Sequence, residues 1–224
     1  MMDMKFEEIS LLVESLISAN ILSKKMDDWG ISVDFNSMTL KKNTYLGLDE
    51  LTRYQYHDKA SRILEDKFSK ENRENKDELI YHMTKSGRCD EAVDYLIISA
   101  EKAAKKGLIK QAIQFLEEGY GYFSDNNICA KKIEICLKLG DLYYKINELD
   151  KCLEYYSSAQ HNAEKNEDAI LLADSHIKMV RLFYSLNNVK SCLKHSAMAK
   201  RIIKRIGYKK GMLDLILALS ELMI

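Results

Sequence analysis

The chain contains the residue types that carry out chemistry in proteins, but not in the spacings that chemistry needs. A loop that holds nucleotide phosphates requires the sequence GxxxxGK[ST], and none of the nine glycines supplies it, since Gly207 and Gly211 are too close together. Five histidines and five cysteines occur without an HExxH or CxxC sequence. We therefore expect no catalytic site, no cofactor and no bound metal.

Cysteine usage also indicates the compartment. Cys129 and Cys136 are seven residues apart and share a helix face, where apolar packing explains them as well as reactivity does. An odd number of cysteines at irregular spacing argues against a disulfide framework. We expect reduced thiols and a cytoplasmic protein.

Charge is unevenly distributed, although the formal net charge is zero. Ten lysines and arginines and no acid lie between residues 175 and 213. The predicted basic patch consists of Lys194, Lys200, Arg201, Lys204 and Arg205. This patch would dock an acidic partner or domain, or it is a set of solvated helix faces and contacts to a further repeat. Nucleic acid is disfavoured, because base-stacking aromatic residues do not alternate with these lysines.

The elements that would position these side chains are helices. The chain contains no proline, whereas average usage of roughly 5% would give about 11. Proline breaks helix interiors, so its absence suits long helices. Hydrophobic residues make up 46% and charged residues 30%, as in ordinary soluble proteins. The sequence has no apolar run of roughly 20 residues and no signal-peptide pattern, so we expect no membrane association.

Apolar spacing divides the first part of the chain into several elements. Residues 5–20 follow a helical period, and residues 21–26 and 31–35 predict a small β-hairpin. A short helix near residues 38–46 and a longer one near 50–68 follow. The polar stretch 69–76 predicts a linker. Two domains are therefore expected, at residues 1–68 and 77–224.

From residue 77 onward the chain repeats itself. A turn residue is followed five positions later by a small residue, in the pairs Gly87/Ala92, Gly107/Ala112, Asn147/Cys152 and Asn187/Cys192. A step of 20 residues equals one helix plus its turn, and a step of 40 equals a helical hairpin. Small side chains recur where two helices approach closely. The fold class is therefore all-α, an α–α superhelix of antiparallel helical hairpins.

One repeat carries the sequence Leu139-Gly140-Asp141-Leu142-Tyr143-Tyr144, followed by Asn147 and Ala159, and it resembles the tetratricopeptide (TPR) family. The family's usual closing proline is missing. The resemblance implies a concave binding surface lined by the first helix of each hairpin. The residues implied there are Glu134, Leu137, Asp141, Tyr144, Lys145, Asp174, Ile177, Lys178, Arg181 and Tyr184. Tyr144 and Tyr184 would anchor a peptide, or they pack between helices.

A second set of residues lies toward the front of the chain, namely Val33-Asp34-Phe35-Asn36, Tyr45, Arg53, Tyr56-His57, Ala60, Leu64-Glu65, Tyr81-His82 and Ala92. With these residues, the front of the chain resembles the winged-helix and TPR region of bacterial signal-transducing ATPases, including LuxR-family regulators. The resemblance implies a winged-helix-like α+β remnant before the solenoid. At those positions we expect His57 and His82 to be buried hydrogen-bonding residues, not catalysts.

The two resemblances imply a non-catalytic interaction and regulatory module, a segment of a multidomain bacterial signalling or transcription-regulating ATPase. Its partner would be a protein, a peptide or a neighbouring domain. Alternatives are a stand-alone peptide-binding adaptor, a DNA-binding regulator and an enzyme assembled from separate repeats. The apolar segment 212–224 would promote a homodimer, or it awaits a further helix.

Overall fold

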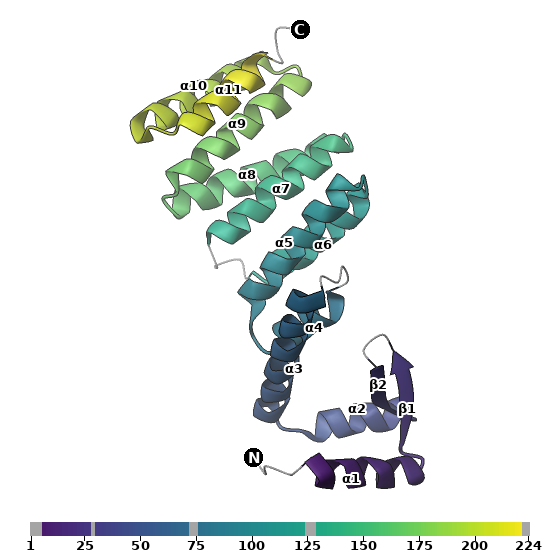
Figure 1. Cartoon of the computed structure of the whole chain (residues 1–224). Coiled ribbons are helices and arrows are strands. Elements are labelled where there is room, and N and C mark those ends of the chain that lie inside the picture. The colour runs from purple at the N-terminus through teal and green to yellow at the C-terminus, as the bar shows by residue number, and fades with distance from the viewer. Residues whose placement is uncertain (1–5, 28–29, 72–75, 124–128, 221–224) are drawn as a thin grey trace.

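The computed structural model describes residues 6–27, 30–71, 76–123 and 129–220. Within these ranges it contains eleven α-helices and one two-stranded β-hairpin. The helices stack one after another along the molecule, and the hairpin lies near the N-terminal end (Figure 1). The predicted all-α solenoid with a small N-terminal hairpin is confirmed.

The N-terminal part consists of two helices and the hairpin, with α1 at Phe6–Ser18, β1 at Leu22–Asp27, β2 at Gly30–Phe35 and α2 at Met38–Gly47. The strands are antiparallel, with Leu22 opposite Phe35. The Ser37 side chain caps α2 by accepting a hydrogen bond from the Leu40 backbone N–H at 3.3 Å. The predicted hairpin and helices are confirmed, while residues 1–5 and 28–29 lie outside the described residues.

The described side chains of this N-terminal part form no hydrophobic core of their own. Among the side chains described between residues 7 and 48, none is buried. Leu11, Met26, Ile31 and Met38 are each more than 70% exposed. A small hairpin without an apolar face against another element is marginal in water. The apolar side chains of α1 and the hairpin are therefore largely exposed to water.

The next two helices lead into the solenoid, with α3 at Glu50–Glu71 and α4 at Asp77–Lys85. The linker predicted at 69–76 begins too early, because α3 continues to residue 71. Lysine and glutamate favour helix, so a stretch without apolar residues can still extend one. Residues 72–75 of that linker lie outside the described residues. Leu64 of α3 packs against the cluster of Leu79, Met83 and Leu96, which joins α3 to the solenoid.

Seven helices complete the fold, with α5 at Cys89–Lys105, α6 at Ile109–Gly121, α7 at Ala130–Lys145, α8 at Leu149–Lys165, α9 at Ala169–Ser185, α10 at Val189–Ile206 and α11 at Lys209–Ser220. Among the described residues, six turns between helices contain a residue with positive φ, at Gly87, Gly107, Asn147, Glu167, Asn187 and Gly207. These positions all fit a 20-residue step. Sequence reasoning identified four of them and missed two. It missed Glu167 because a carboxylate side chain is not a turn signal.

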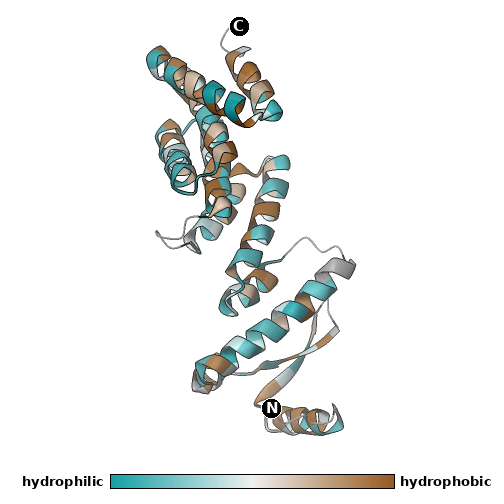
Figure 2. Cartoon of the chain, turned by 90° about the vertical axis from the view of Figure 1, so that its left-hand side faces the viewer, coloured by the Kyte–Doolittle hydropathy of each residue, from teal (hydrophilic) through white to brown (hydrophobic). Residues whose placement is uncertain are grey.

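Helices α5–α6, α7–α8 and α9–α10 form antiparallel hairpins, and α11 packs against α9. Ala112, Cys152 and Cys192 lie on the second helix of a hairpin, whereas Ala92 lies on a first helix. All four are at most 4% exposed, as close helix packing requires. Apolar and polar residues alternate along most solenoid helices, as expected for helices with one buried face (Figure 2).

Candidate partner-binding surface

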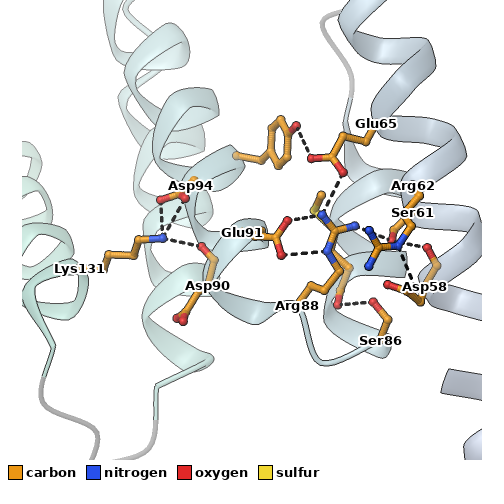
Figure 3. A network of polar contacts seen from close by, with 12 residues as sticks. Asp58, Ser61, Arg62, Glu65, Ser86, Arg88, Asp90, Glu91, Asp94 and Lys131 are labelled. Carbon is orange, nitrogen blue, oxygen red and sulfur yellow. Dashed lines mark hydrogen bonds and ion pairs between the residues drawn. The ribbon is translucent and has the colours of Figure 1, made fainter. Parts of the chain in front are cut away.

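The first helices of successive hairpins, α5, α7, α9 and α11, form what we call the first-helix face. Three ion pairs join neighbours on this face, Lys131–Asp94 at 2.8 Å, Lys138–Glu101 at 2.5 Å and Lys178–Asp141 at 2.7 Å. The two residues of each pair are 37 positions apart. That separation is the 40-residue hairpin repeat less about one helical turn. Lys131 also donates to the backbone oxygen of Asp90 at 2.9 Å (Figure 3).

Two of the predicted groove residues, Asp141 and Lys178, are engaged within the protein. The Asp141 carboxylate accepts one hydrogen bond from the Tyr156 hydroxyl at 2.6 Å and another from the Lys178 ammonium. Burial and the Asp141 carboxylate raise the pKa of Tyr156. These contacts link α7, α8 and α9. The charges of Asp141 and Lys178 are therefore paired within the protein, and their role is to hold the helices of this face together.

The two predicted tyrosines lie half-exposed on adjacent first helices. Tyr144 of α7 is 36% exposed and its hydroxyl lies 2.6 Å from the Ser185 hydroxyl of α9. Tyr184 of α9 is 46% exposed and lies 40 residues after Tyr144. Neither ring is buried between helices, so both present aromatic surface that a partner can contact.

The remaining predicted groove residues fall into two groups. Glu134 and Lys145 are on α7, where Glu134 forms an ion pair with Lys138 at 3.4 Å and Lys145 is exposed. Asp174 and Arg181 are half-buried on α9, and burial raises the pKa of the Asp174 carboxyl, which accepts from Tyr208 at 3.5 Å.

Leu137 and Ile177 were also expected on this surface, and that expectation is wrong. They are 8% and 3% exposed and belong to the hydrophobic core clusters. The side chains at these positions turn inward to neighbouring helices and cannot contact a partner.

The predicted basic patch lies on a different element. Lys194, Lys200, Arg201, Lys204 and Arg205 are all exposed on α10, a second helix. Within the described part of the chain, none of them forms an ion pair. Arg201 lies 3.5 Å from the Met198 sulfur. The fold therefore places the basic patch on a second helix, apart from the first-helix face, where Lys131, Lys138 and Lys178 pair with acids on the neighbouring first helix.

Two histidine pairs, which the sequence analysis did not predict, tie helices together. His57 of α3 and His82 of α4 approach through their Nδ1 atoms at 2.8 Å, and Tyr45 reaches His57 Nε2 at 3.0 Å. Both histidines are hydrogen-bonding residues as expected, but only His57 is buried, since His82 is part-buried. His176 of α9 and His195 of α10 form an equivalent pair at 2.9 Å. In each pair one ring must donate and the other accept, which requires at least one neutral ring.

The His176–His195 pair makes stability depend on pH. Burial, followed by His195, lowers the pKa of His176 to about 4; Lys194 and Arg201 act in the same direction and Glu164 opposes them. In the unfolded chain His176 takes up a proton near pH 6.5, whereas in the folded chain it does so only near pH 4. The stabilisation that comes from this difference is therefore complete above pH 6.5 and is lost as pH falls toward 4. We expect a loss on the order of 2–3 kcal/mol in the free energy of unfolding across this window.

Urea denaturation at several values between pH 7 and pH 4.5 measures this effect. His176→Gln should show a shallower pH dependence than the wild type. His161→Gln is the matched control, because His161 is exposed on α8. An unchanged slope in His176→Gln would assign the pH dependence to other groups.

Sites for other chemistry are not apparent in the described residues. They contain no group of three His, Cys, Asp or Glu side chains placed to hold a metal ion. None of the described helices is long and apolar enough to cross a bilayer. All five cysteines are free thiols.

No protein-family model matches the sequence, and the curated proteins contain no significant match to it. Solved structures do match in fold. The apo form of RapI has a TM-score of 0.54 and 11% identity, covering 82% of this chain and 53% of that one. A Rap protein complexed with competence and sporulation factor has a TM-score of 0.49 and 14% identity, covering 79% and 50%.

A putative kinesin light chain of Podosopora anserina with TPR-like repeats has a TM-score of 0.43 and 12% identity, covering 76% of this chain and 95% of that one. This chain spans about half the length of the Rap structures. At such identities the likeness shows the fold alone, a TPR-like solenoid, and the RapI structure carries that conclusion.

Proposed function

We propose that this chain is a non-catalytic module that binds a protein or peptide along the first-helix face. The observation that carries the proposal is the pair Tyr144 and Tyr184, half-exposed one repeat apart on adjacent first helices. Ion pairs between α5, α7 and α9 hold those helices in fixed positions. A rigid surface with exposed aromatic side chains can bind a partner with little loss of its own conformational entropy.

Tyr184 provides the most direct test. A peptide selected from a random library on the immobilised chain should bind Tyr184→Ala about 10-fold more weakly, which corresponds to about 1.4 kcal/mol at an aromatic hot spot. Isothermal titration calorimetry measures the affinity. Tyr56→Ala is the control, since Tyr56 is 54% exposed on α3, outside this face. Equal affinities for Tyr184→Ala and Tyr56→Ala would contradict binding at the first-helix face.

The basic patch on α10 supports a second binding surface, for an acidic partner. Three lysines on the first-helix face pair with acids 37 residues earlier, whereas the five patch cations form no ion pair with described residues. Lys200→Gln with Lys204→Gln should abolish salt-sensitive binding of a polyglutamate peptide in fluorescence anisotropy. Lys110→Gln with Lys165→Gln is a charge-matched control. Loss in both variants would mean that net charge, not this patch, attracts the peptide.

The proposed setting is a multidomain bacterial signalling or transcription-regulating protein of the cytoplasm, in which α1 and the hairpin contact a neighbouring domain. The exposed apolar side chains of residues 7–48 support it, as do the free thiols. An immunoblot of the source cell tests it: a band far above 26 kDa is expected, and a band at that size would leave a stand-alone adaptor. DNA binding through α1 is the weaker alternative, because α1 carries Glu7, Glu8 and Glu14.

A further inference from the structure

An open apolar groove lies between α2 and α4, outside both surfaces described above. Its described lining comes from the end of β2, from α2 and the residues that follow it, and from α4. The apolar and aromatic residues of this lining are Phe35, Met38, Tyr45, Leu46, Leu48 and Tyr81. The groove has a volume of about 1020 Å³, so it has room for several side chains of a partner.

His57 of α3 fixes the two walls of this groove. The Tyr45 and Tyr81 rings pack edge-on against the His57 ring, with centroids 5.8 and 5.6 Å away. The Tyr45 hydroxyl also lies 3.0 Å from His57 Nε2. His57 is 7% exposed, whereas Met38 on one wall and Tyr81 on the other are 75% and 49% exposed. The groove is therefore formed before a partner arrives, and its apolar surface is open to water.

The described lining of the groove is cationic. It contains Lys41 and Lys42 and no acid. Lys41 pairs with Asp34 at 2.8 Å, whereas Lys42 is exposed and forms no ion pair with the described residues. A further cation, Lys85 of α4, lies 5.9 Å from the centroid of the Tyr81 ring. An apolar segment with an acid at its edge fits this groove, and a basic segment would be repelled.

Helix α1 has the complementary character. Ile9, Leu12 and Leu16 follow steps of three and four residues along one face, and they are 46%, 51% and 37% exposed. Helices that dock in grooves present their apolar side chains at this spacing. Glu7 in the first turn of α1 is exposed, and the helix contains no lysine or arginine. The exposed face of α1 therefore matches the groove in both apolarity and charge.

Within one molecule, α1 and the groove are held apart. Asn36 Nδ2 donates to Asn20 Oδ1 at 2.9 Å, and Lys24 pairs with Glu14 at 2.6 Å, so the end of α1 is tied to the hairpin. Figure 1 shows α2 between α1 and α4, so α1 lies on the side of α2 away from the wall that Tyr81 forms. A second copy of the chain can bring its own α1 to the groove.

We propose that α1 of one copy docks in the groove between α2 and α4 of a second copy, and that the second copy makes the same contact in return. Two such contacts related by a two-fold axis form a closed dimer, the commonest symmetry of soluble oligomers. Docking removes the apolar face of α1 and the groove residues Met38, Leu46 and Tyr81 from water. In a longer protein, a neighbouring domain would compete with the second copy for α1.

Sedimentation equilibrium of the full chain, from micromolar to millimolar concentrations, tests the dimer. We expect a species of twice the chain mass of 25.9 kDa. Leu12→Ser with Leu16→Ser should weaken dimerisation by about 10-fold or more, and Met38→Ser with Leu46→Ser in the groove should do the same. All four side chains are at least 37% exposed, so both variants should fold.

Leu213→Ser with Ile216→Ser is the matched control. These side chains are 63% and 55% exposed on α11, outside α1 and the groove, so this variant should dimerise like the wild type. Tyr184→Ala should also dimerise normally, which makes the test independent of the first-helix face.

Photo-crosslinking identifies which surfaces meet. Benzoylphenylalanine in place of Ser10, beside the apolar face of α1, is used in a mixture of chains with and without nitrogen-15. We expect mixed-isotope products that join α1 to a peptide containing α2 or Tyr81. A chain that stays monomeric over the whole concentration range overturns the proposal. Crosslinks between two copies of α1, or equal weakening of the dimer by the α11 variant, overturn it as well.

Discussion

Replacing Gly140 by alanine is expected to lower the free energy of unfolding by about 2–3 kcal/mol, a typical value for overpacking a core. A Cβ atom at Gly140 of α7 would overlap the ring of Tyr156 on α8. The ring cannot move aside easily, because Tyr156 is 3% exposed and its hydroxyl is held by Asp141 at 2.6 Å. Asp141 is in turn bound by Lys178 of α9, so a displacement of the Tyr156 ring and Asp141 would also disturb the next hairpin.

Urea denaturation measures the change, and Gly121→Ala is its control. A Cβ at Gly121 meets nothing within 4 Å, so that substitution should be neutral or stabilising. In a Tyr156→Leu background the ring is gone, and Gly140→Ala should then lower the free energy of unfolding by less than about 1 kcal/mol. A full effect in that background would place the strain elsewhere than at this contact.

The close approach at Gly140 shows what the sequence could reveal about the fold. The Leu139-Gly140 pair, the small residues and the turn residues each mark a backbone constraint, and such constraints are local. They were sufficient to predict helices, hairpins and the repeat. Two turns were missed. One of them, at Glu167, has the same positive φ, but glutamate is not a residue type that indicates a turn. There the helices on either side impose the turn.

The candidate surface was less predictable, because it depends on how each helix is rotated. A shift of one residue turns a side chain about 100° around the helix axis. Positions carried over from a repeat of another length can therefore point inward, as Leu137 and Ile177 do, while Tyr144 and Tyr184 point outward. The histidine pairs and the 37-residue ion pairs join residues from separate helices. They become visible only once the packing of those helices is known.

The second large effect is expected at Arg88, which joins α3 to the start of the solenoid. Its guanidinium contacts Glu65 at 2.9 Å and Ser61 at 3.0 Å on α3, and it also pairs with Glu91 on α5 (Figure 3). The side chain is only 13% exposed, so removing its charge leaves Glu65 and Glu91 without their shared partner. Arg88→Met should lower the free energy of unfolding by about 2–3 kcal/mol.

Arg62→Met is the matched control, since Arg62 is 66% exposed and pairs with Asp58 one turn away, an interaction worth about 0.3–0.5 kcal/mol. Hydrogen exchange locates the effect of Arg88→Met. Amides of α3 and α4 should lose protection, while those of α7–α10 keep theirs, because contacts in a solenoid are between neighbours. Uniform loss along the chain would mean instead that the whole protein unfolds as one unit. Loss confined to α3 and α4 would identify Arg88 as the coupling between the N-terminal elements and the solenoid repeats.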